Sequence, residues 1–416
     1  MDICLHTYYE ISDPYIGGTQ TLLIKLAKEL KVLGHEPFIV CSSLKTHFVI
    51  EGIDVYGVIP EQYTNLLRTK YNGVPSSKFL KEAIFGDSKV QDGLRSLADY
   101  SYEQYSKFQA DIYHLNSYIA AYAQETRTPI VAYQHENEQE FDGFWGEGKF
   151  QQLIDFVKNK SSQIQNRPCL FTASHHYANT FSKRFQIPIQ SVHLGVLLND
   201  MAYSKKVTYT EETMFGRSAS TIVILIPSRF NVKQKGQDLA LLACEILLEK
   251  GYNIEVVFSG MKNSLLPELD EFRTKNRTKK ISQHLHFLSA YSMFTLYGAA
   301  HIVLSPERYC SYGLSISEAL AIGIPTVLSD IPTYIEIASG YQHAIFFQKD
   351  NLEDLVSKLE YAIKSSAECG YRYNNSAIEF RINNDIRKTA VAFSRIYKSL
   401  LAQRGLSVAE RSVKLS

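Results

Sequence analysis

Apolar and polar positions along the chain change repeatedly between the two-residue period of strands and the period of helices. Residues 3–5 are apolar and predict a strand, and a polar loop through Gly17 and Gly18 leads into a helix. That helix carries an apolar stripe and ends at Gly34, the stripe being Leu22, Leu23, Leu26, Ala27, Leu30 and Leu33. This order of strand, glycine loop and helix is typical of an α/β protein.

The same alternation continues through the first half of the chain. Strands are predicted at 37–40 and 53–58, and two later strands end near His114 and at His135. Residues 61–108 are less regular. Their basic and apolar side chains suit either a helical segment that is exposed to solvent or an amphipathic face that contacts an acceptor or a membrane surface.

A polar, turn-rich segment at residues 199–219 divides the chain and predicts a linker. After it the alternation of strands and helices restarts, which predicts one domain at 1–198 and a second at 220–375. Residues 376–416 are helical in pattern, and we expect them to pack back on the first domain. The predicted fold class is therefore α/β with two doubly wound domains.

One stretch, residues 305–330, passes from loop to helix to strand without interruption. In a doubly wound sheet this order places the loop at the carboxyl edge, where ligands bind. Glu318 is expected early in the helix, beside free backbone amides. It is either an ordinary first-turn carboxylate or, with an anion on those amides, a partner for the hydroxyl groups of a ligand.

A second candidate loop follows the first strand of the second domain. Arg229, Lys233 and Lys235 lie between this strand and the next helix, with Gly236 beside them. Cations at the end of a buried strand suit a bound phosphate. Solvation of an ordinary surface loop is the alternative.

The first domain contains three further candidates. Gly17 and Gly18 allow close approach of the backbone to a ligand, although such a pair is also a common turn. His135 follows a strand, where it either bonds a sugar hydroxyl or serves as a structural hydrogen-bond partner. Trp145 lies in the glycine-rich segment 141–150, which we expect to be a loop that stacks on a sugar or covers the site.

Composition narrows the class of protein further. The chain has 416 residues, 45% of them hydrophobic, so it is long enough to form two hydrophobic cores. Its net charge of +1 excludes a strongly acidic or basic polyelectrolyte, so nucleic acid is not the expected partner. The six cysteines include no C-x-x-C pair, which indicates reduced thiols rather than a zinc site or a disulfide scaffold. The first residues resemble no signal peptide and no stretch is apolar enough to span a bilayer, so we expect a cytoplasmic protein.

Taken in order, these motifs resemble glycosyltransferase family 4, retaining nucleotide-sugar enzymes of the GT-B fold. The likeness covers nearly the whole chain and rests on the Gly17-Gly18 loop, VAYQH at His135, TASHH at Ser174, HLGV at Gly195, PSRF with Lys235-Gly236, and SYGLSISEALAIGIPTVLSD. It implies two Rossmann-like domains facing a central cleft, with the acceptor on the first and the donor on the second. It also implies metal-independent transfer with no cofactor beyond the donor itself, and no D-x-D triplet occurs.

The resemblance assigns roles to individual residues. Arg229 and Lys235 are expected to hold the donor's diphosphate, and His135 to lie near the donor sugar. These three are the catalytic candidates. Glu318 looks like the second glutamate of the family's E-x7-E motif, which holds the ribose. The full set of expected donor-binding residues is Gly17, Gly18, Arg229, Lys235, Cys310, Tyr312, Gly313, Leu314 and Glu318.

Three features depart from the family pattern, one of them being Leu194, which stands where the family often has Asn before Gly-Val. Cys310 stands where the motif has its first glutamate, which contacts the donor hexose, and a thiol is a poor partner for sugar hydroxyls. Glu307 is three residues too early to replace that glutamate without a rearranged loop. The interval from Arg229 to Lys235 is also one residue longer than usual, so Lys233 competes for the role of Lys235.

The leading hypothesis is a retaining hexosyltransferase. Its donor would be a nucleotide diphosphate sugar, a UDP-sugar first, and its acceptor a hydroxyl of a glycan, a lipid-linked intermediate or a small molecule, with peripheral contact to the inner face of a membrane. Cys310 motivates one alternative, a non-catalytic nucleotide-sugar-binding subunit. A phosphorylase or epimerase on the same fold is another.

Overall fold

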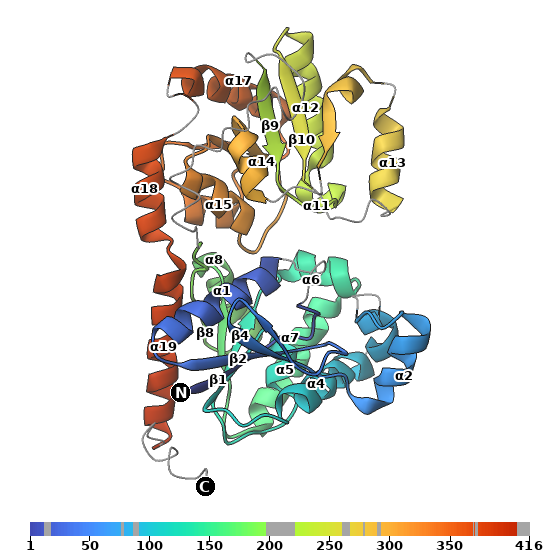
Figure 1. The fold of residues 1–416 in the computed structure, drawn as a ribbon, viewed down its shortest axis with the longest axis vertical. Coiled ribbons are helices and arrows are strands. Elements are labelled where there is room, and N and C mark those ends of the chain that lie inside the picture. The colour runs from blue at the N-terminus through green and yellow to red at the C-terminus, as the bar shows by residue number, and fades with distance from the viewer. Residues whose placement is uncertain are drawn as a thin grey trace. The chain divides into compact units, whose positions relative to one another are not determined.

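The chain forms two compact units in the computed structural model, and each is described here by itself (Figure 1). The first unit contains Met1–Gly195 and Ile386–Ser416, and the second contains Val196–Asp385. The expected linker at 199–219 and Gly17 lie outside the described residues, which are 1–11, 18–75, 79–85, 91–196, 221–259, 267–277, 279–288, 293–368, 370 and 373–405.

A sheet of eight strands forms the centre of the first unit. Its order is β3-β4-β2-β1-β5-β6-β7-β8, parallel except for the antiparallel pair β3 and β4. The strands are β1 (Asp2–His6), β2 (Glu36–Cys41), β3 (Phe48–Ile50), β4 (Ile53–Gly57), β5 (Ile112–Leu115), β6 (Ile130–Gln134), β7 (Cys169–Thr172) and β8 (Ile189–Ser191). The order reverses between β1 and β5, so a ligand crevice is expected at their carboxyl ends.

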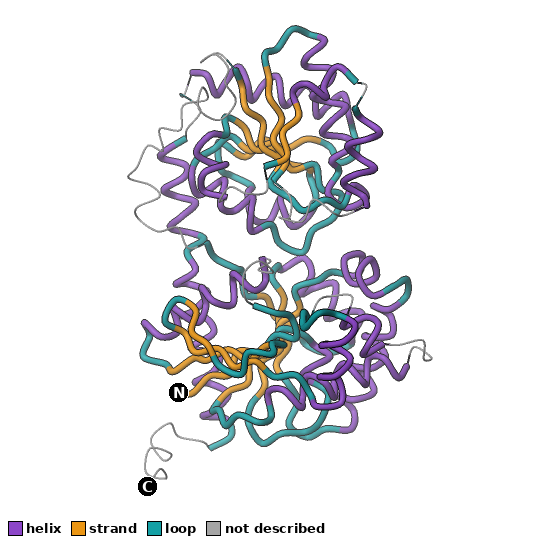
Figure 2. Tube along the Cα trace, turned by 45° about the vertical axis from the view of Figure 1, so that its right-hand side comes forward, coloured by secondary structure: helices purple, strands orange, loops and turns teal. Residues whose placement is uncertain are grey.

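Helices cover both faces of this sheet (Figure 2). One face carries α1 and α19, which pack on each other, and the other face carries α4, α5, α7 and α8. The helices are α1 (Gly18–Val32), α2 (Glu61–Lys70), the π-helix η1 (Leu80–Phe85), α4 (Gln91–Tyr105), α5 (Tyr118–Ala121), α6 (Glu138–Trp145), α7 (Lys149–Gln163), α8 (His175–Phe185) and α19 (Ile386–Gln403). The segment 61–108 is thus mostly helical.

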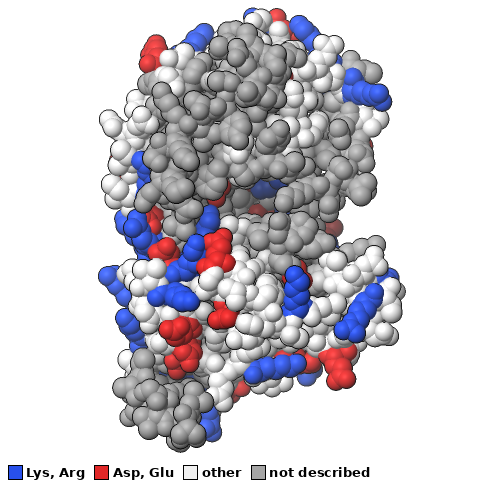
Figure 3. Space-filling view, viewed as in Figure 1, with Lys and Arg blue, Asp and Glu red and all other residues white. Residues whose placement is uncertain are grey.

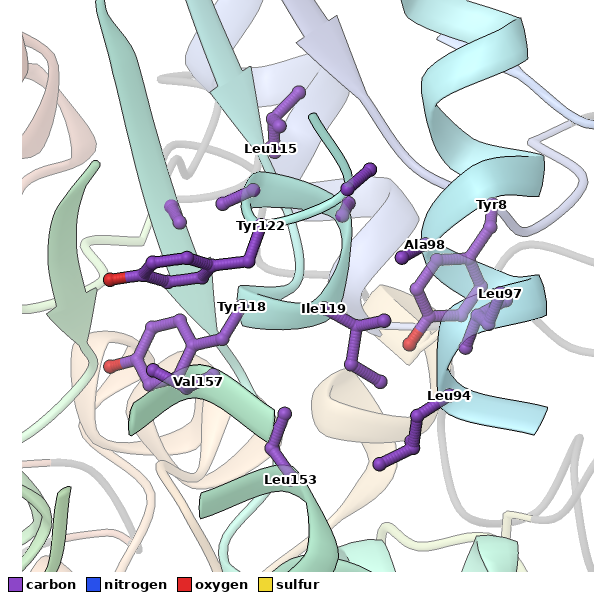
Figure 4. Packing of buried hydrophobic residues seen from close by; sticks show 14 of the residues in the cluster. Tyr8, Leu94, Leu97, Ala98, Leu115, Tyr118, Ile119, Tyr122, Leu153 and Val157 are labelled. Atoms are coloured by element: carbon purple, nitrogen blue, oxygen red, sulfur yellow. The ribbon is translucent and has the colours of Figure 1, made fainter. Parts of the chain in front are cut away.

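Large apolar side chains fill the space between the sheet and the α4 face. Figure 4 shows Ile119 of the short helix α5 between Leu97 of α4 and Leu153 of α7, with Tyr118 of the same helix on the other side of Ile119 from Leu97. These four side chains are 2% exposed or less. Burial of this kind contributes about 1.5–3 kcal/mol per side chain, so the central position of α5 follows from its apolar sequence.

The second unit has a sheet of six parallel strands in the order β11-β10-β9-β12-β13-β14. The order reverses between β9 and β12, which is a second topological switch point. The strands are β9 (Ile222–Ile226), β10 (Ile254–Phe258), β11 (Leu285–Phe287), β12 (Ile302–Ser305), β13 (Thr326–Ser329) and β14 (Ala344–Phe347).

Helices α12 and α17 pack on one face of the second sheet, and α14 and α15 on the other. The helices are α11 (Val232–Lys235), α12 (Gln237–Glu249), α13 (Pro267–Asn276), the 3-10 helix η2 (Lys280–His284), α14 (Met293–Ala299), α15 (Leu314–Ile322), α16 (Pro332–Ala338), α17 (Leu352–Glu368) and α18 (Asn374–Asn383). The predicted fold class, two Rossmann-like doubly wound domains, is confirmed.

The unit boundaries differ in detail from the predicted domains. Helix α19 packs along α1 in the first unit, whereas α18, which the prediction grouped with it, belongs to the second. The periodicity of a helix shows which of its faces is apolar but not which sheet covers that face, so the sequence did not separate α18 from α19.

Surface and thiol chemistry agree with the composition. Acidic and basic side chains are interspersed on the face of the first unit seen in Figure 3. All five described cysteines are free. Within the described part of the chain, no helix is both long and apolar enough to cross a bilayer.

Candidate functional site

The switch point of the second unit joins the two loops that the sequence singled out. The basic loop follows β9, and the loop before α15 follows β12, its neighbour in the sheet. Both loops therefore leave the carboxyl edge of adjacent parallel strands. In doubly wound proteins this is where a ligand is bound.

Local interactions fix the shape of the basic loop. Phe230 is buried and packs on Phe258 of β10 at a centroid distance of 5.5 Å, which anchors the loop in the core. Asn231 caps α11 by accepting a hydrogen bond from the amide of Gln234 at 3.1 Å. Arg229 is exposed and donates to the Gln234 side chain at 3.1 Å, so its guanidinium is oriented but still accessible.

Arg308 fastens the two loops together. Its guanidinium makes a bidentate contact with Asp238 at 3.0 and 3.1 Å, donates to Asp350 at 2.7 Å and to the Val232 carbonyl at 2.8 Å. Its backbone amide donates to the Gln234 carbonyl at 2.8 Å. These contacts engage Arg308 on several sides, so its place is in the scaffold of the site, and they raise the pKa of its guanidinium.

Lys235 and Lys233 face different surroundings, although they are two residues apart. The Lys235 ammonium lies 2.7 Å from a carboxylate oxygen of Glu307, within the switch point. Lys233 is exposed and lines a separate hollow of about 450 Å³ beside α12 and α13. The geometry favours Lys235 as the cation of this site.

The turn before α15 is shaped by its glycine. Gly313 has φ +154°, and a Cβ there would lie 2.7 Å from Cε1 of Tyr334. Tyr312 is buried, which raises the pKa of its phenol well above the usual value, so this residue presents its backbone and not its side chain. Cys310 is 8% exposed and its thiol donates to the Tyr312 carbonyl at 3.2 Å, so the thiol serves the turn itself.

Glu318 is not in the first turn of its helix, contrary to the sequence-based expectation. Helix α15 begins at Leu314, which places Glu318 one turn further on, and it has no acidic residue in its first turn. The carboxylate is partly exposed and accepts a hydrogen bond from the Tyr297 hydroxyl at 3.2 Å. The interpretation of Glu318 as a first-turn carboxylate that interacts with the helix dipole is therefore wrong. Its binding of ligand hydroxyls stays a prediction.

In the first unit, His135 follows β6 and lies beside Asn116, which follows β5. His135 Nε2 donates to Asn116 Oδ1 at 3.2 Å. Burial lowers the pKa of His135, so the ring is neutral near pH 7. Gly18 is the first residue of α1, and Thr19, next to it, lines a small cavity together with His135 and Asn116. The start of α1 and the predicted histidine are thus neighbours.

Trp145 does not lie in a loop. It is the last residue of α6, a helix that starts with a capping box formed by Asn137 and Glu140, and its side chain is buried. Its ring packs on Phe144 at 4.6 Å and Tyr8 at 6.3 Å. The glycines around it predicted a loop, but the capping box of Asn137 and Glu140 starts a helix that continues to Trp145.

Sequence reasoning missed Arg308 and the partnership of Glu307. A contact between residues 72 positions apart has no local signature, and the Ser-Pro-Glu-Arg run carries no recognised motif. The available signal was the adjacent charged pair Glu307 and Arg308, since the other residues from 306 to 314 are uncharged.

The same two-unit architecture is found in solved glycosyltransferases. WaaG, a glycosyltransferase involved in lipopolysaccharide biosynthesis, aligns with a TM-score of 0.68 and 14% identity over 95% of this chain and 99% of that one. An α,α-trehalose-phosphate synthase (UDP-forming) from Burkholderia xenovorans aligns with a TM-score of 0.70 and 13% identity over 95% and 99%. The chain therefore has the GT-B fold.

The amino-acid sequence is similar to that of glycosyltransferases. Residues 214–379 match the family model described as Glycosyl transferases group 1. The O-antigen biosynthesis glycosyltransferase WclY of Escherichia coli is 23% identical over 214 residues, which are 51% of this chain and 56% of the relative. The match thus spans little more than half the length of the relative.

Proposed function

We propose that the protein is a retaining glycosyltransferase of family 4 that moves a hexose from a nucleotide diphosphate sugar to an acceptor hydroxyl. The group 1 match over residues 214–379 supports the reaction class. A UDP-sugar is the first donor to test, because the fold is shared with a UDP-forming synthase. A glycan or lipid-linked acceptor is suggested by a relative named for O-antigen biosynthesis.

The observation that carries the proposal is the arrangement of charge at the β9–β12 switch point. Arg229 and Lys235 lie on the loop after β9, and the first-turn amides of α15 follow the loop after β12. Cations and helix amides together suit a diphosphate. Glu318, one turn further along α15, supplies an acceptor for ribose hydroxyls.

This arrangement matches what glycosyl transfer demands of a protein. The bond from the anomeric carbon to the diphosphate breaks, and negative charge grows on the leaving oxygen. The Arg229 guanidinium would stabilise that charge, and the N–H groups of Lys235 would donate hydrogen bonds to the same phosphate. His135 is neutral, so it is suited to hydrogen bonding with the sugar and not to supplying a positive charge.

We assign the acceptor-binding site to the first unit. Tyr9 and Phe144 are partly exposed and pack edge to face at 6.1 Å, near the carboxyl end of β1. The Lys81 ammonium lies 4.4 Å from the centroid of the Phe144 ring. Aromatic faces beside a cation suit a sugar ring that carries a negative group.

Binding and turnover with a panel of donors test the proposal. UDP-, GDP- and dTDP-sugars are titrated by calorimetry, and we expect at least one to bind and to be slowly hydrolysed, with or without a chelator. Arg229→Ala should abolish turnover and leave the melting temperature within a few degrees of wild type. Absence of binding to every nucleotide sugar would refute the proposal.

The burial of Cys310 favours one second candidate, a non-catalytic nucleotide-sugar-binding subunit. Its thiol is engaged with the Tyr312 carbonyl and is not offered to a sugar. Nucleotide affinity without transfer to any acceptor in a broad screen would support this candidate. Gain of transfer in Cys310→Glu would show that the missing carboxylate is the cause.

A further inference from the structure

We propose that Glu307 is a positioning residue that holds the Lys235 ammonium in the donor site and, by its charge, promotes release of the nucleoside diphosphate product. The inference rests on the proposed function, because it concerns the same diphosphate subsite. Glu307 does not contact the reacting atoms. It acts through Lys235.

The carboxylate of Glu307 is built into the protein. The residue is 3% exposed and follows directly after β12. Its backbone carbonyl accepts a hydrogen bond from the Ser329 hydroxyl, and its side chain interacts with the hydroxyl of buried Tyr334. The carboxylate therefore cannot move away when a ligand arrives, and the Lys235 ammonium at 2.7 Å is held against a fixed partner.

This pairing changes the charge that a ligand meets. The side chains of Lys235 and Glu307 are 13% and 4% exposed, so water screens neither of them well. Together they are neutral, whereas Arg229 and Lys233 of the same loop are exposed and lie outside this pair. An ammonium paired with a carboxylate still has N–H groups to donate, so Lys235 can orient a phosphate without adding a full positive charge.

Substrate and product differ in charge at this position. In a nucleotide sugar the terminal phosphate is esterified, whereas after transfer it gains a free oxygen and an additional negative charge. Two uncompensated cations would therefore bind the product more tightly than the substrate and slow turnover. A fixed carboxylate next to the terminal phosphate disfavours the additional charge, so it weakens product binding more than donor binding.

Glu307→Gln tests this, because the amide oxygen still accepts a hydrogen bond from Lys235 while the charge is removed. The matched control is Glu360→Gln, which makes the same charge change in the exposed Lys250–Glu360 pair of the same unit. Calorimetry with UDP and with the UDP-sugar that wild-type protein binds is run for both variants. We expect Glu307→Gln to lower the Kd of UDP by about tenfold and the Kd of the UDP-sugar by less. The variant should also have a lower kcat, because release of UDP becomes slower.

A purely structural role predicts the opposite result. If Glu307→Gln binds UDP no more tightly than wild type while its melting temperature shows a folded protein, the inference is wrong. The control should leave both Kd values within twofold of wild type, and an equal tightening in the control would also overturn the inference.

Failure of this inference can be distinguished from failure of the proposed function. If wild-type protein binds no nucleoside diphosphate, the proposed function fails, and inorganic pyrophosphate becomes the probe of the subsite. Tighter pyrophosphate binding by Glu307→Gln than by Glu360→Gln supports the charge effect, and its absence overturns it. A double-mutant cycle of Lys235→Met and Glu307→Gln on the unfolding midpoint tests the pair without any ligand, and additive shifts would show that no pair exists.

Discussion

The carbonyl oxygen of Pro306 lies 2.1 Å from the point where a Cβ on Gly236 would stand. Gly236 ends α11 and starts α12 with φ +64°, so it places the basic loop directly against the loop after β12. Any side chain here would separate the two loops. The glycine is therefore a structural requirement of the switch point.

We expect Gly236→Ala to destabilise the protein by at least about 2 kcal/mol, combining the strain of positive φ with the clash. Urea unfolding measures this change. Gly251→Ala is the control, since Gly251 has φ +89° and nothing within 4 Å of its missing Cβ. Gly251→Ala should lose only about 1–2 kcal/mol of stability, the cost of positive φ at an alanine. Equal losses in the two variants would contradict the clash between a Cβ at position 236 and the Pro306 carbonyl.

The two lysines of α11 should differ sharply in function. Lys235→Met leaves the buried Glu307 carboxylate unpaired, so we expect a loss of about 3–5 kcal/mol in stability and weaker binding of a nucleotide sugar. Lys233→Met should change the unfolding free energy by less than about 0.5 kcal/mol and the Kd hardly at all. Calorimetry and urea unfolding on both variants check this, and a larger effect from Lys233→Met would reverse the assignment.

Glu318 is predicted to recognise ribose. Wild-type protein should bind UDP about tenfold more tightly than 2′-deoxy-UDP, as expected for the loss of one hydrogen bond to a charged carboxylate. Glu318→Ala should weaken UDP and reduce this discrimination to near one. Tyr297→Phe keeps the carboxylate but removes its hydrogen bond, so it should retain most of the preference. Full discrimination in Glu318→Ala would exclude the ribose role.

Stability should fall as the pH is lowered from 7 toward 4. Burial lowers the pKa of His6 to about 4 and that of His114 to about 3, whereas an unfolded histidine has a pKa near 6.5. Between these values the unfolded chain binds protons that the folded chain does not, so each group removes up to about 1.4 kcal/mol per pH unit.

Unfolding midpoints in urea at several pH values measure this dependence. In His114→Asn the unfolding midpoint should depend less steeply on pH below 6.5, because the contribution of one histidine is removed. The control is His47→Asn, because His47 is exposed and paired with Asp54 at the surface. A wild-type midpoint that is flat between pH 4.5 and 6.5 would show that these histidines are not held neutral.

Much of the fold could be predicted because its determinants are local. The apolar stripe of Leu22 to Leu30 and the stop at Gly34 predicted α1 (Gly18–Val32) nearly as it is found. Apolar runs likewise predicted β1, β2, β4, β5 and β6 of the first unit, whereas β3 was missed because its three residues are too few to show a period. The short strand β14 was not predicted either.

The candidate site was only half predictable, since half of it is made of long-range contacts. Arg229 and Lys235 were recognisable as cations at a strand end. That Lys235 pairs with Glu307, and that Arg308 is engaged with Asp238 and Asp350, depends on which strands are neighbours in the sheet. Charge along the chain gave no means of choosing between Lys233 and Lys235, whereas the direction of each side chain does.

The membership of α19 in the first unit has a consequence for synthesis on the ribosome. His114 of β5 bonds to the Tyr397 hydroxyl at 2.6 Å, and Phe393 packs on the same histidine. The face of the first sheet that carries α1 is thus only partly covered until residues near 400 emerge, whereas the second unit is contiguous and can complete its core earlier. We therefore expect the nascent first unit to depend on chaperones longer than its early position would suggest.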